Sequence, residues 1–316
     1  MTRSKVKLRD LWRAVRLSAA AAAAAFALGA LAPDMAFAQE TTAPVAAEQA
    51  APVAEAAPEA AAPAEITAPE QSVDKGDVTW MMTSAILVLL MIIPGLALFY
   101  GGLVRTKNAL SVLMQVSTVT VIGMIMWALV GYSLAFTTGP GALDTFIGGT
   151  ARFFLFDTVD GVVTDLSDNL VATFSTGVYL PELVFVVFQM TFACITAALV
   201  LGGLAERVKF IGVVLFSIFW PLLVYYPMAH MVWWWPGPDA VAAHPNDAIA
   251  SGLIWSFGAL DFAGGTVVHI NSGIAALMGA LVLGKRTGYK KEPMPPHSLM
   301  MTLIGTGLLW FGWFGF

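Results

Sequence analysis

The chain contains 316 residues, of which 58% are hydrophobic and only 12% are charged, and its formal net charge is −5. Its mean hydropathy of +0.77 is too high for a soluble globular protein and indicates a protein that crosses a membrane several times. This composition argues against nucleic-acid binding, and the single cysteine, Cys194, excludes a disulfide framework and a cysteine-based metal site.

The N-terminal segment has the three parts of a secretory signal peptide. Six lysine and arginine residues lie within the first sixteen positions, and an apolar stretch covers 17–31. The small-residue site Ala36-Phe37-Ala38 follows, so we expect residues 1–38 to be a signal peptide cleaved before Gln39. An uncleaved first helix is the alternative.

Residues 39–75 are mostly Ala, Pro and Glu. This composition lacks the large apolar side chains needed to offset the entropy of ordering, so it predicts a disordered tail. A transmembrane domain is then expected over 76–316.

The first two membrane spans are predicted over 78–104 and 109–136, because these apolar runs are long enough to cross a bilayer. Pro94 and Gly95 are expected to bend the first span. The polar loop after the second span carries five aspartates up to Leu180, and we expect a solvated loop with at most a short helix.

The third span is predicted over 181–205 and the fourth over 210–228. Phe185, Phe188 and Phe192 fall on one helical face of the third span, which is typical either of packing or of a pore gate.

The segment after the fourth span contains three consecutive tryptophans, beginning at Trp233. The segment extends to Ser251, and within it we expect His230 and His244 to be interfacial or solvated.

The fifth span is predicted from about Ile254 to Leu283, and it contains an imidazole, His269, within an apolar segment. At about 100° per residue, several small residues share the face of His269. They are Gly265, Ser272, Gly273 and Ala276. An ionisable group at membrane depth indicates a functional site unless a neighbouring helix satisfies it structurally, and both readings stay open.

Asp261 lies in the same segment and has a capping role as its simplest explanation, since a carboxylate accepts hydrogen bonds at a helix N-terminus. A basic loop, 284–291, follows this span. A sixth span is expected to begin near Ser298, with His297 at the interface.

The loop charges predict the orientation. The loops after the first, third and fifth spans contain eight cationic residues, against Arg152 alone in the opposite loops. Because cationic loops stay in the cytoplasm, we expect a multi-pass inner-membrane protein with its N-terminus outside.

Four separate strings resemble the ammonium transporter family, the Amt/Mep/Rh group. They are PGLALFYGGLVRTKN at 94–108, FQMTFACIT at 188–196, GLAERV at 203–208 and WFGF at 313–316. The resemblance implies an all-α polytopic helix bundle built in the family from about eleven helices as two inverted halves. About five and a half are present here, which implies a fragment that ends before the partner histidine of the second half.

The resemblance also implies residue roles. Phe192 and Phe316 match the two pore phenylalanines, and Trp233 matches the tryptophan that recruits the cation together with Phe192. His269 would relay a proton or pass ammonia, and Asp261 would support the site without touching the permeating molecule.

The implied function is movement of ammonium or ammonia, with methylammonium as an analogue, through a hydrophobic pore. A sensor of the same family with little transport is the alternative. The resemblance further implies a homotrimer and a cytoplasmic PII-type regulator. We expect no enzymatic activity, cofactor or metal site.

The signal-peptide interpretation predicts a mature protein that begins at or near Gln39, because the small-residue site precedes that residue. N-terminal sequencing of the protein purified from membranes measures this directly. A mature chain that begins at Met1 would contradict both the cleavage and part of the argument for orientation.

Overall fold

The computed structural model describes residues 71–159, 162–244 and 249–316. The predicted signal peptide at 1–38 and most of the predicted tail at 39–75 lie outside the described residues. The last residues of that tail include strand β1 (Ser72–Val73) and the start of helix α2.

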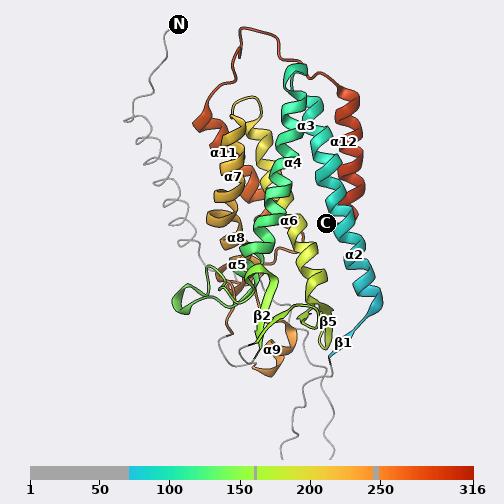
Figure 1. The fold of residues 1–316 in the computed structure, drawn as a ribbon, viewed down its shortest axis with the longest axis vertical. Helices are drawn as coiled ribbons and strands as arrows, with labels where there is room; N and C mark the ends of the chain where they lie inside the picture. Colours follow the sequence, from blue (N-terminus) through green and yellow to red (C-terminus); the bar gives the residue numbers. More distant parts are fainter. Residues whose placement is uncertain (1–70, 160–161, 245–248) are drawn as a thin grey trace, which may run out of the picture. The chain divides into compact units, whose positions relative to one another are not determined.

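The described residues contain five helical segments that are long and apolar enough to cross a membrane (Figure 1). They cover Lys75–Leu103, Thr106–Phe136, Glu182–Leu204, Phe210–Trp233 and Gly265–Leu283, and a shorter apolar segment covers Leu299–Gly315. The expectation of a mainly helical membrane bundle is confirmed.

The segments consist of helical elements joined end to end. The first contains α2 (Lys75–Leu90), η1 (Met91–Leu96) and α3 (Ala97–Leu103), and the second contains η2 (Thr106–Asn108), α4 (Ala109–Met126), η3 (Trp127–Gly131) and α5 (Tyr132–Phe136). The third is α6 (Glu182–Leu204), and the fourth contains α7 (Phe210–Trp220), η6 (Pro221–Tyr225) and α8 (Tyr226–Trp233). The fifth contains η7 (Gly265–Ile270) and α11 (Asn271–Leu283), and the last contains α12 (Leu299–Gly312) and η8 (Trp313–Gly315).

The first span bends as expected. Ile93 has φ −127° and ψ 109°, which are not helical values, and Pro94 follows it. A proline disfavours the helical region for the residue before it, which explains why the break lies at Ile93.

The expected start of the fifth span near Ile254 is wrong. Only the short helix α10 (Leu253–Ser256) forms there, and the long helix begins at Gly265. Two residues in the left-handed region, Gly258 at φ +80° and Gly264 at φ +70°, lie between α10 and the long helix. Helices commonly end at such residues, so the chain turns before it enters the membrane segment.

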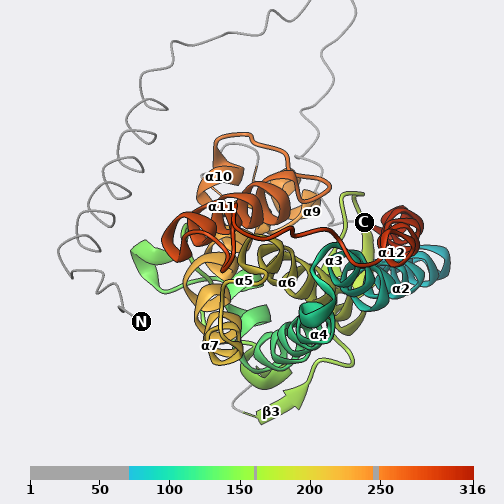
Figure 2. The ribbon, with the colours of Figure 1, turned by 90° about the horizontal axis from the view of Figure 1, so that it is seen from above.

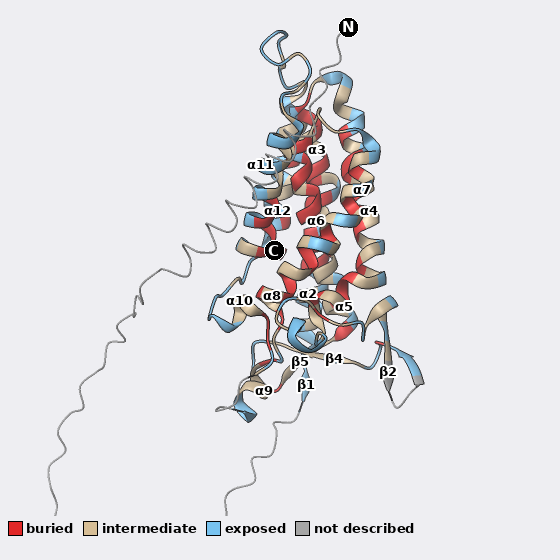
Figure 3. Ribbon diagram, turned by 90° about the vertical axis from the view of Figure 1, so that its left-hand side faces the viewer, coloured by how far each residue is buried: buried red, intermediate tan, exposed pale blue. Residues whose placement is uncertain are grey.

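Helix α6 lies at the centre of the bundle, packed against α2, α4 and α11 (Figure 2). Of its 23 residues, 13 are buried, and the buried residues concentrate along it and its neighbours (Figure 3). A Cβ at Gly203 would lie 2.5 Å from the carbonyl oxygen of Ala276, so glycine permits the close approach of α6 and α11.

The loop at 137–181, expected to be solvated, also forms small sheets at one end of the bundle. This end, which includes residues 72–73 and 238–243 as well, is named here the sheet end. Strands β2 (Phe156–Val159) and β3 (Val162–Asp165) pair antiparallel. Strand β5 (Val178–Pro181) pairs with β1 in parallel and with β4 (Leu170–Ala172) antiparallel. The short helices η4 (Gly141–Leu143), η5 (Phe153–Leu155) and α9 (Pro238–Ala243) also lie at this end.

His230 is buried and not solvated, which corrects one of the two alternatives expected from sequence. The residue is 0% exposed. Its Nδ1 lies 3.0 Å from the carbonyl oxygen of Ala135, and its Nε2 lies 2.5 Å from that of Asp144. A neutral imidazole has one N–H, so it donates a hydrogen bond to one of these two carbonyl oxygens, which belong to helix α5 and to the segment after it. His244 is exposed, as expected.

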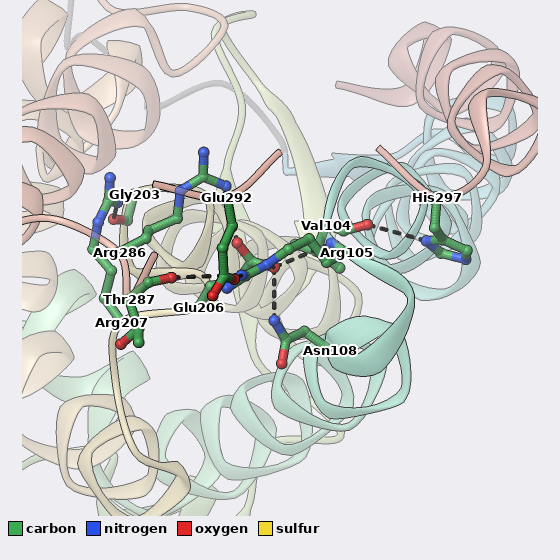
Figure 4. A network of polar contacts seen from close by, with 10 residues as sticks. All are labelled: Val104, Arg105, Asn108, Gly203, Glu206, Arg207, Arg286, Thr287, Glu292 and His297. Carbon is green, nitrogen blue, oxygen red and sulfur yellow. Dashed lines mark hydrogen bonds and ion pairs between the residues drawn. The ribbon is translucent and has the colours of Figure 1, made fainter. Parts of the chain in front are cut away.

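At the opposite end, named here the basic end, Glu206 connects several chain segments (Figure 4). Its Oε1 accepts hydrogen bonds from Arg105 Nε at 3.0 Å and Asn108 Nδ2 at 2.6 Å, and Arg286 Nη1 lies 2.9 Å from Oε2. The side chain of Glu206 is 0% exposed. Nearby, His297 Nδ1 lies 3.1 Å from the carbonyl oxygen of Val104.

The environment of Glu206 favours its charged form. Burial alone would raise its pKa, but the hydrogen bonds from Asn108 and Arg105 and the charge of Arg105 outweigh burial and lower the pKa from 4.5 to about 2. This carboxylate therefore contributes stability that is fully present above about pH 4.5 and is lost as the pH falls toward 2.

We predict that Glu206→Ala lowers the stability of the full-length protein at pH 7 by about 3 kcal/mol, because it leaves Arg105 and Arg286 without their shared carboxylate. Glu292→Ala is the matched control, since Glu292 is 64% exposed and lies 3.8 Å from Arg105. The control should cost less than about 0.5 kcal/mol. Thermal unfolding in detergent compares the two, and equal stabilities would contradict the prediction.

Candidate functional site

A cavity of about 570 Å³ opens at the sheet end of the bundle. It is lined by the start of α2, the first half of α6, the end of α8, the turn before η7 and the last residues of the chain. About half of the lining residues are aromatic, and the charged lining residues among those described are Asp77 and Asp261. The cavity is therefore apolar in its walls and negative in its charge.

Phe192 forms the centre of the ring contacts in this cavity. Its side chain is 4% exposed, and its ring centroid lies 4.8 Å from that of Phe316 and 6.2 Å from that of Trp233. Phe188, one turn earlier on α6, lies 4.7 Å away. The structure thus brings together Phe192, Trp233 and Phe316, which are far apart in the sequence.

Trp233 is the last residue of α8 and is held from its polar edge. Its indole Nε1 donates a hydrogen bond to the carbonyl oxygen of Asp261 at 2.7 Å. Since this bond fixes the ring edge, the ring keeps a defined orientation beside Phe192.

Asp261 precedes the helix instead of lying on its first turn. Its Oδ2 accepts hydrogen bonds from the backbone N–H groups of Thr266 and Val267 at 3.0 and 2.9 Å. These are first-turn donors that lack partners within the helix, so the contacts match the expected capping role. The carboxylate still lines the cavity.

His269 lies beyond Phe316 as seen from the cavity. Its ring centroid is 5.3 Å from that of Phe316 and 6.1 Å from that of Trp313. His269 does not line the cavity itself, and its ring has no hydrogen bond to any described residue. Phe316 therefore contacts both Phe192 and His269 and separates the imidazole from the cavity.

Gln189 is a lining residue that the sequence analysis did not select as a site residue. Its Oε1 is buried without a hydrogen-bond partner among the described residues, and it lies next to Phe188 on α6. A buried amide oxygen without a partner is unusual and marks an available acceptor. A polar residue within an apolar span was the signal that could have identified it.

Similarity to known proteins identifies the family of this chain. A family model described as Ammonium Transporter Family matches residues 79–316. The chain belongs to the ammonium transporter family. The ammonium transporter of Mycobacterium bovis is 43% identical over 247 residues, which cover 77% of this chain and 50% of that relative.

Solved structures of the ammonium transporter family give the same fold. The crystal structure of Saccharomyces cerevisiae Mep2 matches with a TM-score of 0.60 and 33% identity, covering 77% of this chain and 48% of that one. A structure named Sensor Amt Protein matches with a TM-score of 0.59 and 27% identity, covering 76% and 53%. The chain thus spans about half the length of these relatives.

We predict that Asp261→Ala destabilises the full-length protein by about 1 kcal/mol, because it removes the acceptor for two N–H groups at the helix start. Asp261→Asn keeps an acceptor oxygen and should retain most of the stability. Asp168→Ala, at an exposed position of the sheet end, is the control. Thermal unfolding of the variants measures this, and an Asp261→Ala protein as stable as the control would rule out the capping role.

Proposed function

We propose that the complete protein moves ammonium or ammonia across the inner membrane and thereby supplies nitrogen to the cell. The observation that supports this most is the series of ring contacts from Trp233 through Phe192 and Phe316 to His269, which leads from the cavity into the bundle. Membership of the ammonium transporter family supports the choice of substrate.

The first step would be recruitment of the cation at Trp233 and Phe192. The face of an aromatic ring attracts a cation, and this attraction is worth up to about 2 kcal/mol when the site is desolvated. The negative charges of Asp77 and Asp261 in the cavity wall would raise the local concentration of cations. Gln189 Oε1 offers a hydrogen-bond acceptor in the same wall.

The second step would be passage between Phe192 and Phe316 toward His269. Moving a bare ion into an apolar pore costs about 20 kcal/mol in the idealised limit. Deprotonation would remove this cost: ammonium would give its proton either to water in the cavity or to the imidazole of His269, and neutral ammonia would carry no charge into the pore. While it is neutral, the imidazole can accept one hydrogen bond from ammonia.

The same two phenylalanines would provide selectivity. Their rings are 4.8 Å apart from centroid to centroid, so the contact is closed to hydrated ions. Sodium and potassium cannot lose a proton, and the rings offer no oxygen ligands to replace their water. We therefore assign the pore gate to Phe192 and Phe316.

The orientation in the membrane, the oligomeric state and the regulator are also proposals. The cationic loops of the basic end, Arg105, Arg207 and Arg286 among them, would face the cytoplasm, with the N-terminus outside. A homotrimer and a cytoplasmic PII-type regulator follow only from the family resemblance. Chemical cross-linking of the full-length protein in membranes tests the trimer.

The second candidate is an ammonium sensor with little transport, which the match to the Sensor Amt Protein favours. A sensor would bind the cation at Trp233 and Phe192 without sustained flux. Methylammonium uptake by vesicles that contain the full-length protein separates the two functions.

We predict that His269→Ala in the full-length protein changes methylammonium flux by at least about tenfold or abolishes it, because the imidazole no longer accepts a proton or hydrogen bond in the pore. The control is Ile274→Ala, at a 57% exposed position on the following turns of the same helix. Flux and membrane yield are measured together for both variants. Unchanged flux in a stably inserted His269→Ala protein would refute the relay role.

A further inference from the structure

Four aromatic side chains form a group at the mouth of the cavity, which we name the aromatic shelf: Phe174, Trp235, Trp255 and Phe262. The centroid of Trp235 lies 5.3 Å from that of Phe174 and 5.4 Å from that of Trp255, and Phe174 lies 6.1 Å from Phe262. These residues come from separate segments: the loop after β4, the segment after α8, helix α10 and the turn before η7.

Two rings of the shelf are largely exposed in the described part of the chain. Phe174 is 68% exposed and Phe262 is 89% exposed, so neither gains much from burial of apolar surface. Trp255 stacks on Trp235 with an interplanar angle of 21°, and the ring of Phe174 is inclined at 33° to that of Trp235. These contacts keep Trp235 in place, while the exposed surface of the shelf comes from Phe174 and Phe262.

The shelf belongs to the same cavity as the site proposed above. Phe174, Trp235 and Phe262 line it together with Phe192 and Trp233. The cavity gives about 570 Å³ of space to the centre of a water-sized solute, and one such solute needs about 10–15 Å³ on this measure. There is room for a bound cation at the shelf in addition to one at Trp233.

The chemistry of the shelf favours a cation. A cation held over an aromatic ring lies within about 6 Å of the ring centroid, so rings at these spacings can be contacted in pairs by one ion. Asp77 and Asp261 supply negative charge to the cavity, and no lysine, arginine or histidine is found among its described lining residues. Groups of aromatic faces with this character bind quaternary ammonium ions.

We propose that the aromatic shelf is a second cation site, which binds ammonium and alkylammonium ions at the mouth of the cavity before they reach Trp233 and Phe192. This inference rests on the proposed function and adds a site to it. Because the shelf is open, it accepts bulky ions such as tetramethylammonium. That ion has no proton to lose, so it binds without being conducted.

The test uses vesicles that contain the full-length protein, with methylammonium uptake as the readout and tetramethylammonium as the inhibitor. We expect inhibition of the unmodified protein, and an inhibition constant about five to ten times higher for Trp235→Leu and for Phe174→Leu. Phe146→Leu is the matched control, since Phe146 is a 44% exposed phenylalanine of the sheet end that does not line the cavity.

Titration calorimetry with tetramethylammonium on the purified full-length protein gives a second readout that does not need transport. Binding by the unmodified protein that weakens in Trp235→Leu, but not in Phe146→Leu, supports the shelf even if methylammonium flux is absent. Absence of flux alone would contradict only the proposed transport function.

Two results would overturn the shelf. One is the lack of both inhibition and binding by tetramethylammonium in the unmodified protein. The other is an equal inhibition constant in all variants, which would indicate that the rings serve as an interfacial anchor; membrane yield would then change instead.

Discussion

The hydrogen bonds of one residue before a helix start, Asp261, hold the candidate site together. Asp261 accepts from two first-turn N–H groups through its side chain, and its backbone carbonyl accepts from the indole of Trp233. One residue thus fixes both the entry of the fifth span and the ring at the cavity wall. Because His269 follows on that helix, the position of the imidazole against Phe316 depends on the same bonds.

A second carboxylate has the corresponding role at the basic end. Glu206 joins the end of the first span, the start of the second and the loop after the fifth through Arg105, Asn108 and Arg286. Between these two polar anchors the bundle is held by apolar packing around α6 and by close helix contact at Gly203. The aromatic cavity lies at the end that Asp261 organises, so the site and the loop network are built on separate ends of the same helices.

The length of the hydrophobic runs predicts four spans within a few residues. A helix of this length crosses the bilayer with apolar side chains facing the lipid and with its backbone N–H and C=O groups hydrogen-bonded internally. The start of the fifth span was wrong, since left-handed glycines at 258 and 264 break a segment that hydropathy treats as continuous. The burial of His230 could not be predicted, because its backbone partners lie 95 and 86 residues away.

Family resemblance points to Phe192, Trp233 and Phe316, and only the fold brings their rings into contact. Nothing local in the sequence marked Phe174 or Trp255 as neighbours of Trp235.

In the function we propose, the rings of Trp233 and Phe192 receive the cation before it meets Phe316. The most direct measurement is a high-resolution structure of the full-length protein with methylammonium. We expect density for the cation within about 6 Å of both ring centroids, on the cavity side of the contact between Phe192 and Phe316. A protein that conducts methylammonium but shows the bound cation elsewhere, with these two ring faces covered by other side chains, would contradict the claim.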